Sequence, residues 1–137
     1  MQASISSGII PENVVYLGFD IGSVSLNTAV TDACNNILED FYDYVHGKPF
    51  HVLRERLSFI LGKYSGKTIK GIALTGSGGR LAAKLIGGIF INEIIAQVSS
   101  TSELYPEVKT VIEIGGEDSK LILLDKDADN GQSVLAD

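Results

Sequence analysis

The 137 residues predict an α/β fold, a mixed β-sheet in the order βββαβα followed by the first strands of a second unit. Three observations indicate it: β-branched runs that end at glycines, helical spacing of apolar residues between them, and a strand–glycine turn–strand pattern that occurs twice. The two copies lie at 14–32 and 110–124. They predict a first subdomain at 14–109, the start of a truncated second one at 110–137, and a flexible leader at 1–13.

The first three strands are expected at 14–20, 26–32 and 37–45. The links between them are too short for a parallel crossover, so neighbouring strands should run antiparallel. A proline suits the first turn of a helix at 49–64, in which apolar residues fall at helical spacing. The next strand, at 69–75, is reached through that helix and is expected to lie parallel to the first.

The second half of the sequence alternates glycine turns with regular elements. A glycine loop at 76–79 leads into a helical stretch, and another helix is expected at 92–104. Strands at 110–114 and 119–124 flank a second glycine turn, and a further strand begins at 133.

Composition excludes several classes of function. The net charge of −6 argues against a nucleic-acid binder, which needs a basic face. ATP is compatible with this charge, because backbone N–H groups can hold phosphates locally. The single cysteine, Cys34, permits no intrachain disulfide and favours a reducing compartment, the cytoplasm. The apolar runs are shorter than the ~20 residues that span a membrane.

The first glycine turn, LGFDIGSVS, has the chemistry of a phosphate-binding loop. Gly22 lets the backbone approach a ligand closely, and the N–H groups of Ser23, Val24 and Ser25 can point at phosphate oxygens. Asp20 closes the buried strand and cannot face phosphate without a cation or water, so it is expected to hold Mg²⁺ through water.

The second turn, VIEIGGEDSK, repeats this chemistry about 90 residues later. Gly115 and Gly116 allow a close approach, and Asp118 follows on the return strand. The two turns together predict a clamp on the phosphates of ATP. Asp20 and Glu113 are the expected catalytic carboxylates, which position Mg²⁺ and the attacking water.

Other candidates are weaker. The loop TGSGGR, 75–80, fails the dinucleotide fingerprint because Leu81 stands where the third glycine is required. Arg80 has two equal interpretations, a contact near phosphate or a partner and a structural role. Glu93 is slightly favoured as an ordinary exposed charge. The calcium-loop-like segment 125–131 is interpreted as a polar hairpin turn, because asparagine replaces its obligatory glycine.

With both turns and the TGSGGR loop in order, the sequence resembles the ATPases that activate 2-hydroxyacyl-CoA dehydratases and drive benzoyl-CoA reductases, the CoA-substrate-specific enzyme activases. The resemblance covers residues 14–124. It implies a ribonuclease H-like fold of the actin, Hsp70 and sugar-kinase superfamily, with ATP and Mg²⁺ between two related halves. It also implies a homodimer that shares one [4Fe–4S] cluster and passes an electron to a CoA-ester dehydratase or reductase partner.

The sequence departs from this family at several positions. Val24 and Asn27 stand where the family often has Thr and Lys, and Glu113 and Glu117 replace its usual Asp and Gln. The cluster cysteines of the family lie downstream of the second motif and Cys34 matches neither, so the cluster ligands are not in this chain. We therefore expect an inactive N-terminal fragment that binds ATP weakly or not at all. The alternatives are a small-molecule kinase of the same fold and a non-enzymatic, nucleotide-gated interaction module.

Overall fold

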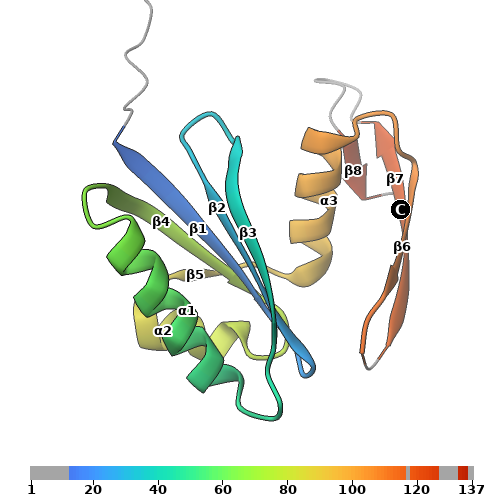
Figure 1. Ribbon diagram of the computed structural model, residues 1–137. Helices are drawn as coiled ribbons and strands as arrows, with labels where there is room; N and C mark the ends of the chain where they lie inside the picture. The colour runs from blue at the N-terminus through green and yellow to red at the C-terminus, as the bar shows by residue number, and fades with distance from the viewer. Residues whose placement is uncertain (1–12, 117, 127–132, 136–137) are drawn as a thin grey trace, which may run out of the picture.

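The computed structural model describes residues 13–116, 118–126 and 133–135. Within these ranges the strands form two sheets, one in the order β3-β2-β1-β4-β5 and one in the order β6-β7-β8 (Figure 1). This is the mixed α/β fold that the sequence predicts. Most of the predicted leader, the polar segment from 127 to 132 and Glu117 lie outside the described residues.

The first three strands form an antiparallel meander, as predicted. Their bounds are β1 Val14–Ile21, β2 Ser25–Thr31 and β3 Ile37–Tyr44. Alternate residues of β1 are buried, because a strand directs successive side chains to opposite faces of its sheet. Asp20 therefore lies on the face opposite the main core, near the carboxyl end of the strand.

Helix α1 (Pro49–Lys63) leads to β4 (Thr68–Thr75), which pairs with β1 in parallel as expected. The next helix, α2 (Gly79–Ile86), ends where Gly87 takes a left-handed conformation with φ of 78°. A two-residue strand follows, β5 (Ile89–Phe90), parallel to β4. The sequence did not predict β5, because two residues are too few to show a period.

Helix α3 (Glu93–Leu104) connects the two sheets. The second sheet consists of β6 (Thr110–Ile114), β7 (Ser119–Lys126) and β8 (Ser133–Leu135), paired antiparallel. Strand β7 is two residues longer than predicted, so Asp125 and Lys126 belong to it rather than to a turn.

The helices cover the sheets unequally. Helices α1 and α2 lie on one face of the five-stranded sheet, and α3 lies on the other side, beside the second sheet (Figure 1). The larger core is formed by the buried face of β1, with its neighbours on β2, β4, α1 and α2: Val15, Leu17, Phe19, Ile21, Leu26, Val30, Leu53, Ile60, Leu74, Ala82 and Ala83. A smaller core joins Val98 of α3 to Ile122 and Leu124 of β7. None of the described helices is long and apolar enough to cross a membrane.

Candidate functional site

The first glycine turn joins β1 to β2. It closes through a hydrogen bond of 2.9 Å from the Gly22 N–H to the Ser25 carbonyl oxygen. Asp20 pairs across the ladder with Asn27, and Asn27 Nδ2 donates to Asp20 Oδ2 at 3.3 Å. The Gly22 N–H is thus used inside the turn, which leaves Ser23 and Val24 at its tip.

The second turn has the same construction. The Gly115 N–H donates to the Asp118 carbonyl oxygen at 2.9 Å, which closes four residues just as Gly22 and Ser25 do. Glu113 pairs across the ladder with Lys120, as Asp20 pairs with Asn27 in the first turn. The repeat seen in the sequence is therefore a repeat in hydrogen bonding and register. In both turns the first glycine shapes the turn, so its N–H is not free to donate to phosphate.

The two turns meet. A Cβ atom added at Gly116 would lie 2.6 Å from Val24 Cγ2 and 3.8 Å from Ser23 Oγ. Both turns line one cleft of about 900 Å³. All nine site residues that the sequence predicts line it: Asp20, Gly22, Ser23, Val24, Ser25, Glu113, Gly115, Gly116 and Asp118.

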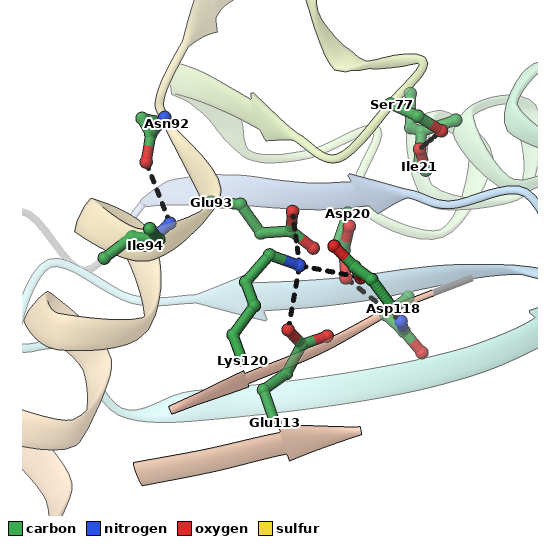
Figure 2. Close-up of polar contacts among 10 residues, drawn as sticks. Asp20, Ile21, Ser77, Asn92, Glu93, Ile94, Glu113, Asp118 and Lys120 are labelled. Carbon is green, nitrogen blue, oxygen red and sulfur yellow. Dashed lines mark hydrogen bonds and ion pairs between the residues drawn. The ribbon is translucent and has the colours of Figure 1, made fainter. Parts of the chain in front are cut away.

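The cleft is also lined by a lysine, Lys120, that the sequence interpretation missed. Lys120 Nζ lies 2.9 Å from Asp118 Oδ1 and 3.0 Å from Glu113 Oε2 (Figure 2). Hydrogen bonds to Asp118 and then to Glu113 raise the pKa of Lys120 above its ordinary value, so the side chain is an ammonium. The available signal was the repeat itself, because Lys120 occupies the position of Asn27 in the first hairpin.

Glu93 also faces this cleft, whereas the sequence slightly favoured an exposed charge. Its Oε2 lies 3.6 Å from Lys120 Nζ, and the side chain is partly buried. The cause is the start of α3, where Asn92 Oδ1 accepts the N–H of Ile94 at 2.9 Å (Figure 2). This cap fixes the first turn of α3 at the rim, and Glu93 is the first residue of that turn.

The TGSGGR loop packs against the end of β1, next to the first turn. Gly76 has φ of 81°, and a Cβ there would lie 2.5 Å from Asp20 Oδ1 and 2.6 Å from the Ile21 carbonyl oxygen. The N–H of Gly78 donates to that carbonyl oxygen at 3.0 Å. Arg80 does not line the cleft but stacks on Phe90, its guanidinium carbon 4.4 Å from the ring centroid, which favours the structural interpretation of this residue.

The carboxylates fit an indirectly held Mg²⁺ better than a metal bound by protein alone. Among the described residues, no group of three or more His, Cys, Asp or Glu side chains could hold a metal ion. Mg²⁺ typically keeps several waters and uses one or two carboxylates together with substrate phosphates. Asp20 and Glu113, in one cleft between two glycine turns, match that donor set. Their metal and catalytic roles remain predictions.

The strand order, the mixed sheet and the paired glycine turns define an actin-, Hsp70- and sugar-kinase-like fold of the ribonuclease H type. Neither a family model nor a curated protein matches the chain. Solved structures do. A ROK-family glucokinase from Streptomyces griseus, in complex with glucose and AMPPNP, superposes with a TM-score of 0.52 at 14% identity, over 80% of this chain and 44% of its own. That likeness concerns the fold alone.

Two activator structures are similar in both fold and sequence. Component A of (R)-2-hydroxyglutaryl-CoA dehydratase from Acidaminococcus fermentans matches with a TM-score of 0.70 at 25% identity, over 88% of this chain and 45% of its own. The activator of 2-hydroxyisocaproyl-CoA dehydratase from Clostridium difficile, with bound ADPNP, matches with a TM-score of 0.69 at 25% identity, over 90% and 46%. These matches confirm the resemblance to the dehydratase-activating ATPases. The chain spans a little under half of the length of either protein.

Proposed function

We propose that this chain forms one side and the beginning of the other side of an ATP phosphate clamp, in a protein that activates a CoA-ester dehydratase or reductase. The observation that carries the proposal is the pair of glycine turns, identical in hydrogen-bond closure and in contact at Gly116 and Val24. The similarity to an activator with bound ADPNP supports nucleotide as the ligand.

The tips of the turns supply the proposed phosphate donors. Because Gly22 and Gly115 use their N–H groups to close the turns, the donors proposed for phosphate are the N–H groups of Ser23, Val24 and Gly116. The hydroxyls of Ser23 and Ser25 add side-chain donors from the first turn. These groups hold phosphate oxygens without a net positive charge, which suits an acidic protein.

Asp20 and Glu113 are the proposed outer ligands of Mg²⁺, each through water. When bound, the ion would neutralise phosphate charge and help to orient the attacking water. Asn27 and the Gly76 loop keep the Asp20 carboxylate in place before nucleotide arrives. Glu113 is held in the same way by Lys120.

The wider activity is proposed from the resemblance. In the whole protein, ATP binding and hydrolysis would drive electron transfer to a dehydratase or reductase partner, through a homodimer that shares one [4Fe–4S] cluster. The proposed contribution of these 137 residues is the phosphate clamp. Cys34 is exposed and does not line the cleft, and we propose no role for it in the cluster.

Amide NMR with millimolar ADPNP, with and without Mg²⁺, tests the proposal even where binding is weak. We expect Mg²⁺-dependent shifts at Ser23, Val24 and Gly116. Asp20→Ala should abolish them. Asp40→Ala is the matched control, because Asp40 lies on the same face of the sheet, on β3 in register with Gly18, and does not line the cleft. Equal shifts in wild type and Asp20→Ala, or shifts confined to other regions, would refute the proposed site.

A further inference from the structure

Lys120 joins its own hairpin to α3. Its ammonium contacts Glu113 at the end of β6, Asp118 in the turn before β7, and Glu93 in the first turn of α3. A lysine that served only its own hairpin would need no more than Glu113, its partner across the ladder. The contact with Glu93 reaches out of the hairpin and across the cleft to α3 (Figure 2).

The charges around this ammonium do not balance. One positive charge faces three carboxylates, which leaves a local charge of 1 − 3 = −2 before Asp20 on the opposite turn is counted. Such a cleft repels a bare phosphate chain and attracts a divalent cation. Lys120 is a cation that these three carboxylates share.

We propose that Lys120 is the resident counter-ion of the nucleotide-free cleft and exchanges its partners when a metal–nucleotide binds. The inference rests on the proposed function and specifies the regulation of the same site. Lys120 gives up Glu113 and Asp118 to the hydrated metal, and its ammonium moves to the phosphates. A lysine suits this role because its compact charge sits on a flexible four-carbon stem with rotatable donors, and the side chain is partly exposed.

The exchange links nucleotide binding to α3. The Glu93–Lys120 contact ties the capped start of α3 to the second hairpin. When Lys120 moves to phosphate, that tie is released and the first turn of α3 changes its surroundings. Lys120 is thus a positioning residue whose state reports whether the cleft is filled.

Titration with Mn²⁺ alone tests the exchange on the whole chain, with free Mn²⁺ followed by electron paramagnetic resonance. Removing one ammonium at contact distance from the carboxylates should tighten Mn²⁺ binding by about tenfold in Lys120→Met. Lys120→Gln is a second neutral variant in case methionine disturbs the hairpin, and amide spectra check that both are folded. Lys84→Met, which removes an exposed charge on α2, should bind Mn²⁺ like the wild type. Unchanged Mn²⁺ affinity in both neutral variants would overturn the proposal.

A second measurement tests the link to α3. Addition of Mg²⁺ and ADPNP should shift the Ile94 amide in the wild type, and this shift should be lost in Lys120→Met. A shift of equal size in both proteins would overturn the link. If the wild type binds no nucleotide, the proposed function fails while the Mn²⁺ comparison still decides the role of Lys120.

Discussion

Replacing Gly76 by alanine tests how tightly the TGSGGR loop holds the end of β1. The new methyl group would lie 2.5 Å from Asp20 Oδ1 and 2.6 Å from the Ile21 carbonyl oxygen, both well inside van der Waals contact. The carboxylate can rotate away, but Ile21 contributes backbone atoms of a central strand that cannot. Gly76 also has φ of 81°, a conformation that alanine adopts at a cost.

Two costs add at this position. The left-handed conformation costs about 1 kcal/mol for a residue with a Cβ. Forcing a methyl group into a closely packed site costs about 1–3 kcal/mol. The expected loss is therefore about 2–4 kcal/mol, a large part of the stability of a small domain. Because the loop also holds Asp20, the Mg²⁺-dependent part of nucleotide binding should weaken as well.

Urea unfolding of three glycine variants separates the two costs. Gly47 has φ of 72° and open space around it, so Gly47→Ala should lose only the conformational part, about 1 kcal/mol. Gly66 has neither a positive φ nor a neighbour within 4 Å, so Gly66→Ala should be neutral or slightly stabilising. If Gly76→Ala and Gly47→Ala lose the same stability, the contact of the loop with β1 has no energetic importance and our interpretation of it is wrong.

Three further predictions follow from the contacts of the fold. Arg56 Nε and Nη2 donate to the Asp43 carboxylate at 2.8 and 2.6 Å and tie α1 to β3, so Arg56→Met should lower the free energy of unfolding in urea by about 1–2 kcal/mol. Ile21→Ala should cost about 2–5 kcal/mol because Ile21 is fully buried, whereas Ile114→Ala at the equivalent exposed position should cost little in the same assay. A side-chain hydrogen bond from Asn36 lowers the pKa of Asp32. The ionised carboxylate therefore stabilises the turn above its ordinary pKa, and this stability is lost as the pH falls through the lowered pKa of the folded state. Amide NMR of the turn should detect the loss, and an Asp32→Asn variant should lack this pH dependence.

The sequence predicted the parts that depend on local chemistry. A carboxylate at the end of a buried strand, followed by glycine and small residues, determines both turns without reference to the rest of the fold. The antiparallel meander follows from short links, and the parallel pairing of β4 with β1 follows from the intervening helix. All nine predicted residues line one cleft.

What the sequence did not predict depends on packing between distant elements. Glu93 faces the cleft only because the capped start of α3 lies against the second hairpin. Lys120 gains a third carboxylate partner only because Glu93, on α3, lies next to the second hairpin. Arg80 stacks on the ring of Phe90, on the short strand β5, which the sequence did not predict. The Glu93 contact and the stacking of Arg80 are not encoded by the local residue pattern.

The same repeat explains why the two halves of the clamp differ. Phe19 and Ile21 of β1 correspond in register to Ile112 and Ile114 of β6, since each isoleucine directly precedes the glycine that closes its turn. In β1 these residues are 2% and 0% exposed beneath α1 and α2, but in β6 they are 71% and 82% exposed. This apolar face of β6 is therefore exposed, because no described residue covers it as α1 and α2 cover β1. The first turn rests on the larger core, whereas the second is fixed by its own closure, by its contact with Val24, by Lys120 and by the smaller core that joins α3 to β7. Because the second side of the clamp has less apolar packing than the first, its geometry depends more on polar contacts such as those of Lys120.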